Sequence, residues 1–503
     1  MFRIKHVDLA GRIGEIQVKS RKIETPALFP VIDPLRQEVS ANEIDSIGFK
    51  QVITNAYLTY KRFGAKAEEQ GIHKIIGFDG VVMTDSGAYQ LLEYGSVDIE
   101  QETVLRYQKR IGSDIGVILD VPTGNVDKEK AEQTVTETLR RARKALEIID
   151  PLQDPIIWVL PLQGGRFLDL LEYSAKEAVK LPYRMYSLGS PTVFLEKYQY
   201  DIIGDMVYTA RKILPWGKPL HLFGAGHPLL IPFMVALGVD TFDSASYILY
   251  ARDNRIMTKN GVHRLEKLEY MPCSTPICLK YTPKELLEMD KNERTRLLAL
   301  HNLYEIKASI NETKEAIREN RLWELLREYA SLHPSTYTLF DKFRKYASYL
   351  EKYTPKTPIN TRGRKILDKK DTWNPIILRH LNYLICKLDI KVDNIIIVPE
   401  PEDRAVPGKN NVFYFKPIIG LIPSNLSRTY PYPQISYPPI LDWESCEWTK
   451  QVIITFLIKK NIKHVKIAIT DKNMPCLKYI ANSLKEKISK KGITVEILSL
   501  THA

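Results

Sequence analysis

The first 250 residues repeat one pattern, in which a short apolar run ends in polar or glycine-rich residues and a helical stretch follows. The runs cover residues 51–57, 80–90, 115–124, 156–165, 183–192, 219–228 and 239–247. Strand and helix in alternation predict a parallel sheet and an α/β fold. About eight strands over roughly 250 residues match a closed (β/α)8 barrel. A doubly wound open sheet is the alternative, but no glycine fingerprint follows the first strand to favour it.

The length of 503 residues predicts two to four domains. We expect a barrel domain over residues 1–335, with a helical subdomain at about 271–310 that begins with two cysteines. A linker or small helical domain would cover 336–360, and a separate α+β or α/β domain would cover 361–503. The first 18 residues alternate polar and apolar side chains, which predicts a pair of strands.

Bulk properties restrict the partners and the compartment. The net charge of +12 favours a polyanionic partner such as nucleic acid. Five cysteines, an odd and sparse set, argue for a reducing cytoplasm and against a disulfide scaffold. No apolar run reaches the roughly 18 residues needed to cross a bilayer, so we expect no membrane partner. The longest such run near the end of the chain, "VIITFLI" at 452–458, reads as a buried strand.

Polar side chains gather where the predicted strands end, which is where chemistry collects in such barrels. These positions are Asp85, Asp120, Gln163, Gly189, Ser190, His227 and Asp243. A single aspartate there could be a turn residue or a helix cap, and aromatic residues nearby could simply fill the barrel mouth. Three carboxylates with an amide and glycines between them point instead to a site. Two carboxylates in different environments can divide the roles of nucleophile and proton shuttle.

Six motifs together carry a resemblance to a known family. They are "MTDSGAYQ", "ILDVPTG", "PLQGG", "YSLGSPT", "HLFGAGHP" and "FDSASYILYARDNRIMT", in that order. In this order and spacing the chain resembles the archaeal tRNA-guanine transglycosylases over nearly its whole length. The resemblance implies a (β/α)8 TIM barrel that replaces guanine 15 in the D-arm of tRNA with 7-cyano-7-deazaguanine, on the route to archaeosine. It also implies a cytoplasmic homodimer that uses no nucleotide or redox cofactor.

The resemblance also implies a role for each motif residue. Asp243 would be the nucleophile that attacks the ribose C1′, and Asp85 would be the general acid and base. Asp120 would hold the amino and ring N–H edge of the purine, and Gln163 would read its carbonyl oxygen. The loop Gly189, Ser190 and Pro191 would contact the base through its backbone, and Tyr89 and Phe223 would sandwich the ring.

Elementary chemistry agrees with these roles. Displacement at an anomeric carbon calls for a carboxylate nucleophile and a second acid that protonates the leaving base. A purine edge with donors beside an acceptor is matched by a carboxylate beside an amide. The base must leave the RNA stack to reach such a pocket, so flipping or local unfolding of the D-arm is implied.

The metal motif departs from the family pattern. The family's structural zinc site implies three cysteines and a histidine, and here Cys273, Cys278 and His301 stand at three of the positions. Thr275 stands where the middle cysteine belongs, and a hydroxyl is a poor zinc ligand. Either zinc binds more weakly, with water or a residue such as His263 completing the site, or the site packs without metal.

The last residues raise a question about tRNA binding. Many archaeal members of the family continue into a C-terminal PUA domain that grips tRNA, and we expect no such domain here. Either a separate PUA-type protein or basic surface of the last domain would supply the grip. Candidate side chains are Lys459, Lys460, Lys463, Lys466 and the lysines of 485–491. Two rival functions are a non-catalytic tRNA-binding subunit and a paralogue resembling archaeosine synthase, which lacks the full catalytic set.

Overall fold

The computed structural model describes residues 2–88, 100–358, 363–399, 411–470, 475–488 and 492–500. The chain divides into two compact units. The first comprises residues 1–318 and 325–342, and the second comprises 319–324 and 343–503. The segment 336–360, predicted as a linker or small domain, is therefore shared between the two units.

An eight-stranded parallel barrel forms the core of the first unit. Its strands are β4 (Ala27–Pro30), β5 (Gln51–Asn55), β6 (Val81–Asp85), β7 (Ile115–Val117), β8 (Ile157–Leu162), β9 (Met185–Leu188), β10 (Leu220–Leu222) and β11 (Thr241–Ser244). Neighbours follow the order β4-β11-β10-β9-β8-β7-β6-β5. A parallel bridge between Val31 and Ile53 closes the circle. The barrel prediction is confirmed. The seven runs of the sequence are β5 to β11. Strand β4 is only four residues long, follows Pro26 and ends at Pro30, and it was not among the predicted runs.

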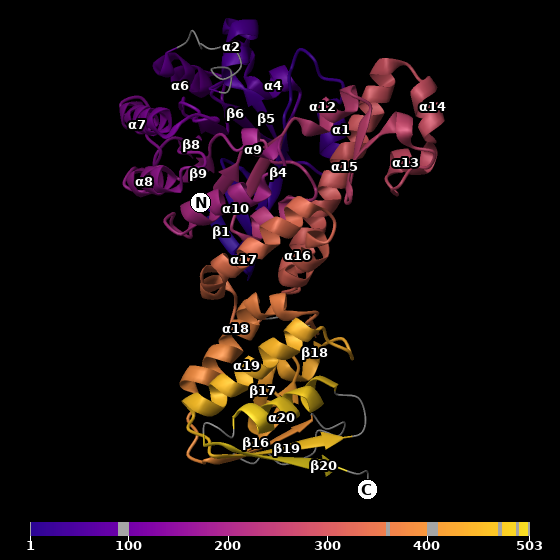
Figure 1. Cartoon of the computed structure of the whole chain (residues 1–503). Coiled ribbons are helices and arrows are strands. Elements are labelled where there is room, and N and C mark those ends of the chain that lie inside the picture. The colour runs from indigo at the N-terminus through magenta and orange to yellow at the C-terminus, as the bar shows by residue number, and fades with distance from the viewer. Residues whose placement is uncertain are drawn as a thin grey trace. The chain divides into compact units, whose positions relative to one another are not determined.

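Helices follow the strands and cover the outside of the barrel (Figure 1). They are α1 (Ala41–Ser46), α2 (Ala56–Phe63), α3 (Ala65–Gln70), α4 (Ile72–Ile76), α6 (Gln101–Arg110), α7 (Lys128–Ala145), α8 (Leu168–Ala178), α9 (Thr192–Leu195), α10 (Tyr200–Arg211), α11 (Ile231–Ala236) and α12 (Ser246–Arg252). Helix α7 shows why such segments are helical. Asp127 caps its first turn by accepting from the Lys130 amide at 2.8 Å, and its apolar stripe is buried.

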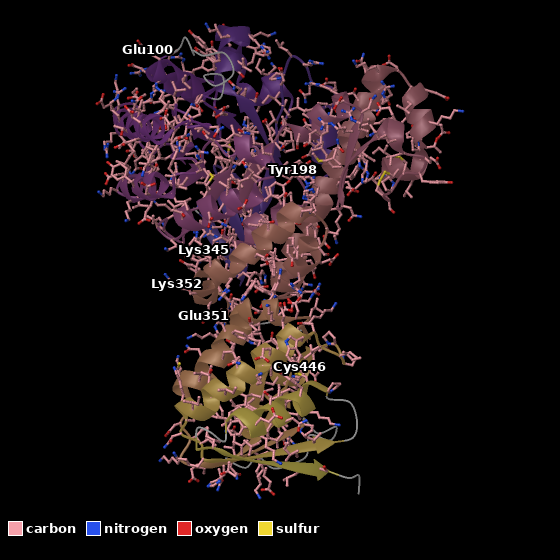
Figure 2. The ribbon with its side chains drawn as sticks, viewed as in Figure 1. Glu100, Tyr198, Lys345, Glu351, Lys352 and Cys446 are labelled. Carbon is pink, nitrogen blue, oxygen red and sulfur yellow. A yellow bond between two sulfur atoms is a disulfide. The ribbon has the colours of Figure 1, made fainter. Side chains whose placement is uncertain are left out.

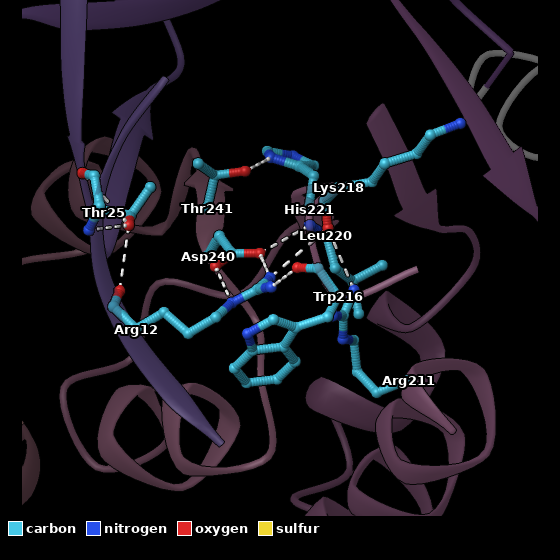
Figure 3. Close-up of polar contacts among 10 residues, drawn as sticks. Arg12, Thr25, Arg211, Trp216, Lys218, Leu220, His221, Asp240 and Thr241 are labelled. Atoms are coloured by element: carbon cyan, nitrogen blue, oxygen red, sulfur yellow. Dashed lines mark hydrogen bonds and ion pairs between the residues drawn. The ribbon is translucent and has the colours of Figure 1, made fainter. Parts of the chain in front are cut away.

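A three-stranded antiparallel sheet packs against the amino-terminal end of the barrel. Its strands are β1 (Phe2–Asp8), β2 (Gly11–Val18) and β3 (Arg21–Thr25), which confirms the predicted strand pair. Ile16, Val18 and Ile23 join the interior side chains of the barrel in one core. Beside them Arg12 forms a buried ion pair with Asp240, which also accepts from the Leu220 amide at 2.8 Å (Figure 3). This end of the barrel is therefore closed by packed apolar side chains and a buried ion pair.

The rest of the first unit extends the barrel. It contains β12 (Arg255–Thr258), β13 (Gly261–Arg264), α13 (Pro276–Lys280), α14 (Pro283–Glu288), α15 (Lys291–Arg318) and the parts within this unit of α16 (Leu322–Ala330) and α17 (Pro334–Tyr353). Asn302 on α15 fixes the hairpin, because its Oδ1 accepts from the Met257 amide at 2.7 Å. Its Nδ2 donates to the Tyr247 carbonyl on α12 at 2.9 Å.

The second unit is a mixed α/β domain. Its strands are β14 (Arg364–Lys365), β15 (Asn394–Pro399), β16 (Val412–Lys416), β17 (Gly420–Pro423), β18 (Ile435–Ser436), β19 (His464–Thr470) and β20 (Thr494–Leu500), and its helices include α18 (Pro375–Asn382), α19 (Trp443–Lys459) and α20 (Pro475–Lys487). The main sheet runs β17-β16-β15-β19-β20. Residues 343–503 contain 27 Lys and Arg against 14 Asp and Glu, a net charge of +13 in a chain that totals +12. The first 342 residues are thus almost neutral.

The prediction that residues 452–458 form a strand is wrong. They lie in the helix α19, with Val452, Ile453, Phe456 and Leu457 buried. A short apolar run does not distinguish a buried strand from a buried helical turn. The same helix begins upstream at Trp443, in a segment that mixes polar and aromatic residues.

The pairing of four of the five cysteines was not predicted from the sequence. Disulfides join Cys273 to Cys278 and Cys446 to Cys476, and Cys386 is free and exposed. Cys446 (Figure 2) lies on α19 and Cys476 in the first turn of α20, two helices that pack together. The number of cysteines in a sequence does not show which of them the fold brings close enough to pair. In the described part of the chain, no helix combines the length and the apolar character needed to cross a membrane.

Candidate active site

A cavity of about 430 Å³ opens at the carboxyl ends of the barrel strands. Asp85, Asp120, Gln163 and Asp243 all line it, and each lies in the last residues of a different strand or just after it. Parallel strands end at the same edge of a barrel, so residues far apart in sequence meet there. The structure also places Gly189, Ser190, Pro191, Phe223 and His227 in the lining. Tyr89 lies outside the described residues.

Asp85 is the last residue of β6 and faces two other carboxylates. Its Oδ2 accepts from the Gly87 amide at 3.2 Å. Burial, together with the negative charges of Asp120 and Asp243, raises the pKa of Asp85 to about 7. A carboxyl group that titrates near neutral pH can both give and take a proton, which suits a general acid and base.

Asp243 is held in one orientation by two donors. Its Oδ1 accepts from the Gly224 amide at 3.0 Å and lies 3.1 Å from His221 Nε2. A carboxylate only accepts, so the proton of His221 is on Nε2, and its Nδ1 accepts from the Thr241 hydroxyl at 3.0 Å (Figure 3). Both bonds engage Oδ1. Among the described residues, the other oxygen of Asp243 is therefore the one available to a substrate.

Sequence reasoning missed His221. It is completely buried in β10, inside the apolar run "PLHLF". The one signal was the presence of a titratable side chain in a strand whose neighbours are apolar, because a buried polar group needs a partner. Its ring also contacts Phe223 edge to face, with centroids 4.6 Å apart. His221 thus supports both the carboxylate of Asp243 and the ring of Phe223.

Asp120 and Gln163 form a fixed pair of a carboxylate and an amide. Gln163 Nε2 donates to Asp120 Oδ2, while its Oε1 accepts from the Thr123 amide at 2.9 Å and from the Ser190 hydroxyl at 3.2 Å. These partners orient the amide, with its NH2 group beside the carboxylate. Burial raises the pKa of Asp120 to about 6, although the bond from Gln163 opposes the rise.

Gly189 is required by the position of Gln163. A Cβ atom at residue 189 would lie 2.1 Å from Gln163 Nε2, so any side chain would displace the amide. The next residue, Ser190, adopts a φ of 59°, which turns the chain sharply at the edge of the cavity. The loop therefore brings its backbone close to the plane in which a flat ligand would meet Asp120 and Gln163.

Other residues of the lining were not predicted from the sequence. Asn55 ends β5 and caps α2 by accepting from the Leu58 amide at 2.9 Å. The same strand-end rule that selected Asp85 would have found it. Tyr198, Tyr200 and Tyr250 also line the cavity. They lie after the strands, in or near helices, where no periodicity marks them.

The predicted metal ligands come together beside α15. The ligand atoms of Cys273, Cys278 and His301 all lie within 4.8 Å of one another. His301 Nε2 donates to the Met257 carbonyl at 2.7 Å, which leaves the Nδ1 lone pair toward the two sulfurs. With the sulfurs reduced, this donor set fits a metal that prefers thiolate and imidazole. With the sulfurs joined in the disulfide, only the imidazole remains.

Thr275 occupies the place of the absent cysteine. Its hydroxyl lies 2.9 Å from His301 Nδ1 and also caps α13, where the Cys278 amide donates to it at 3.4 Å. His263 is outside this group, and its Nε2 lies 3.2 Å from the Thr258 hydroxyl. The described residues therefore offer three metal donors and a hydroxyl.

Comparison with known proteins gives a consistent picture. The family model of queuine tRNA-ribosyltransferase matches residues 8–335. A tRNA-guanine(15) transglycosylase of Aeropyrum pernix is 52% identical over 451 residues, 87% of this chain and 88% of the relative. One of Saccharolobus solfataricus is 47% identical over 495 residues, 94% and 97% of the two chains. A tRNA-guanine(15) transglycosylase of Methanocaldococcus jannaschii is 40% identical over 477 residues, which cover 92% of this chain and 72% of the relative.

Proposed function

The chain belongs to the queuine tRNA-ribosyltransferase family, and we propose that it replaces guanine 15 of tRNA with 7-cyano-7-deazaguanine through a covalent aspartyl-ribosyl intermediate. It is a tRNA-guanine transglycosylase, a pentosyltransferase, by its similarity to relatives of that name over most of its length. The observation that carries the finer proposal is the meeting of Asp85, Asp120 and Asp243 in one cavity.

In the first half-reaction, Asp243 attacks C1′ of the ribose as the bond from C1′ to the guanine nitrogen breaks. Asp85 in its protonated form gives a proton to the departing guanine, so the base leaves neutral. The bonds that Gly224 and His221 make to Asp243 Oδ1 keep the carboxylate aimed while charge moves. The product of this step is an ester between Asp243 and the ribose of the tRNA.

In the second half-reaction, Asp85, now a carboxylate, removes a proton from the incoming base. The freed nitrogen of that base attacks C1′ and expels Asp243, which restores the enzyme. A pKa of about 7 allows Asp85 to serve as acid and base in turn near neutral pH.

Base selection would rest on Asp120 and Gln163. The carboxylate of Asp120 accepts from the amino and ring N–H groups of the purine, and the NH2 of Gln163 donates to its carbonyl oxygen. Guanine and 7-cyano-7-deazaguanine share this edge, so one pocket serves both bases. Phe223, supported by His221, would cover one face of the ring.

Two rival functions fit less well. A non-catalytic tRNA-binding subunit has no need for three carboxylates in one cavity, and a paralogue resembling archaeosine synthase lacks this full set. Both rivals predict no release of guanine from tRNA.

The test is base exchange by the purified protein. Incubation with tRNA carrying labelled guanine at position 15 should release at most one equivalent of label per active site without an incoming base, and many equivalents when 7-cyano-7-deazaguanine is added. Denaturing gels of the quenched reaction should show a protein–tRNA adduct that is absent from Asp243→Ala. No release of label would refute base exchange, and release without any adduct in the wild type would refute the covalent route.

We assign the grip on tRNA to the second unit, because the whole net positive charge lies in residues 343–503. Lys459 and Lys463 are exposed, whereas Lys466 pairs with Glu496 at 3.0 Å. Replacing Lys459 and Lys463 by Gln should weaken tRNA binding and flatten its salt dependence by about one unit of slope per lost phosphate contact. Lys466→Gln is the matched control. Equal slopes for all variants would place the grip elsewhere.

For the metal, Cys273, Cys278 and His301 would hold zinc when reduced, and the ion would tie the α13 turn to α15. Metal content of protein purified under reducing conditions tests this. The homodimer, the separate PUA-type protein and the absence of a nucleotide or redox cofactor stay predictions.

A further inference from the structure

We propose that Tyr198 and His227 form a second subsite of the active-site cavity, which binds an unpaired nucleotide next to the one whose base is exchanged. The inference rests on the proposed function, because it takes tRNA as the ligand. It concerns a different part of the cavity from the Asp120 and Gln163 pair, and residues for which the exchange chemistry has no use.

The cavity is larger than a single base. A volume of about 430 Å³ lies in the range of pockets that hold drug-sized molecules. Besides the catalytic residues, the lining continues over residues of α9, the loop after it, α10 and α12. These additional residues are Thr192, Leu195, Glu196, Tyr198, Tyr200, Leu249 and Tyr250. A purine held at Asp120 and Gln163 leaves this part of the cavity to something else.

Tyr198 has the properties of a stacking platform. It lies in the loop between α9 and α10 (Figure 2), and 37% of its surface is exposed. Its φ of 54° is uncommon for a residue other than glycine, and such conformations cluster at functional sites. The ring of His333 stacks on it, with centroids 5.2 Å apart and planes 27° apart. A large ring is therefore supported from behind and still open to the cavity.

Tyr250, another residue of this lining, is supported in a similar way. Tyr250 on α12 carries the Arg255 guanidinium over its ring at 4.2 Å, and its neighbour Leu249 is 53% exposed. Exposed apolar groups at a cavity mouth indicate a ligand surface. Every base has a π face, so supported aromatic rings bind unstacked nucleotides with little regard for sequence.

His227 supplies a polar group to the same place. Burial lowers the pKa of His227 to about 4, so its imidazole is neutral. Nδ1 accepts from the Leu229 amide at 3.2 Å, which puts the ring proton on Nε2. That buried Nε2 has no hydrogen-bond partner among the described residues. A carbonyl or hydroxyl oxygen of a bound nucleotide would satisfy it.

The charges of the lining favour a base or ribose over a phosphate. Among the described residues the cavity wall includes Glu196 and no lysine or arginine. A phosphate would meet no cation there, whereas a stacked base with one acceptor fits Tyr198 and His227. The backbone phosphates would stay outside, consistent with an exchanged nucleotide that enters together with a neighbour.

The test compares Tyr198→Ala, Tyr198→Leu and Tyr198→Phe in base exchange, with tRNA and free base varied separately. Stacking on an aromatic ring contributes about 1–3 kcal/mol per base, which corresponds to a rise of roughly 5- to 150-fold in KM for tRNA. We expect that rise in Tyr198→Ala and Tyr198→Leu, with KM for the free base changed far less, and near wild-type values in Tyr198→Phe. Tyr173→Ala is the matched control, because Tyr173 is an exposed tyrosine on α8 outside the cavity.

A direct probe is 2-aminopurine in the tRNA at position 14 or 16. Binding of wild-type enzyme should quench its fluorescence at one of the two positions, and Tyr198→Ala should lose that quenching. His227→Phe, which keeps a ring but lacks the N–H, should raise KM for tRNA several-fold with quenching retained. A rise confined to KM for the free base would instead make Tyr198 part of the base pocket. Unchanged KM for tRNA in Tyr198→Ala, when the wild type exchanges bases, would overturn the subsite alone.

Discussion

Two strands of the barrel each carry one aspartate at either end, and the two ends treat them differently. Asp114 precedes β7 and Asp120 follows it, while Asp240 precedes β11 and Asp243 lies near its end. At the amino end Asp240 pairs with Arg12, and Asp114 lies 3.0 Å from His73 and 2.9 Å from Lys19. At the carboxyl end Asp85, Asp120 and Asp243 face one another in the cavity.

The electrostatic consequence is opposite at the two ends. Burial alone would raise the pKa of Asp114, but hydrogen bonds from His73 and Lys19 lower it to about 2. Burial and neighbouring carboxylates raise the pKa values of Asp85 and Asp120 to about 7 and about 6. The same residue type therefore has a lowered pKa where hydrogen-bonded cations outweigh burial, and a raised pKa where burial and neighbouring carboxylates dominate. The ion-paired end holds the barrel together, and the end with raised pKa values is where we propose that the chemistry occurs.

The largest expected effect is at the carboxyl end of β11. Asp243→Ala removes the proposed nucleophile and should lower the exchange rate by at least about a thousand-fold, with tRNA binding kept. Single-turnover rates and filter binding of tRNA measure the two quantities. A rate above roughly a tenth of wild type would move the nucleophile elsewhere, with Asp85 the first suspect.

The next effect is at the amino end of the same strand. Arg12→Leu leaves Asp240 buried without its cation and should reduce the free energy of unfolding by about 3–5 kcal/mol. Folded enzyme at low temperature should retain its exchange rate. The double variant Arg12→Leu, Asp240→Leu should recover part of the stability. Lys50→Ala, which breaks an exposed pair with Asp45, is the control and should cost less than about 1 kcal/mol. If Arg12→Leu behaved like Lys50→Ala, the buried pair would not be what holds this end.

A smaller effect is expected at the end of β7. Asp120→Asn turns an NH2 group toward the donors of the purine and should weaken base binding by about 1–3 kcal/mol. We expect KM for the free base to rise accordingly, with the affinity for tRNA almost unchanged. Equal changes in KM for the free base and in the affinity for tRNA would mean that Asp120 positions the RNA and does not bind the base selectively.

The smallest effect is a dependence of stability on pH. Because the pKa of Asp85 is higher in the folded protein than its ordinary value of 3.8, ionisation costs stability as pH rises from about 4 to about 7. Asp85→Asn should match wild type near pH 4 and be more stable above pH 7, by on the order of 1 kcal/mol because Asp85 is partly exposed to solvent.

For Asp114, the dependence of stability on pH has the opposite sign. Its pKa is lowered, so the stability that it contributes is present above about pH 4 and is lost as pH falls through about 2. Chemical unfolding across pH 4–8 measures the difference in stability between wild type and Asp85→Asn. Parallel stability curves would show that Asp85 does not titrate in this range.

Much of the fold and the site followed from local sequence. The repeat of apolar runs and helical stretches predicted the barrel, because strand and helix periodicity are properties of short segments. The rule that chemistry collects at strand ends selected Asp85, Asp120, Gln163 and Asp243, and the cavity contains all four. The motif order predicted the family. Local patterning failed for residues 452–458, where a seven-residue run with six apolar side chains and one threonine fits a helix and a strand equally.

Only the tertiary structure decided which residues support the side chains of the cavity and the two ends of the barrel. His221 bonds to Asp243 across 22 positions of sequence, Gly189 leaves room for Gln163, and Arg12 pairs with Asp240 across 228. The pairing of Cys446 with Cys476 depends on how α19 and α20 pack. In the barrel, such contacts are set by the register of neighbouring strands and by closure of the sheet. A sequence states which side chains are available, whereas the closed barrel determines which of them lie within hydrogen-bond distance.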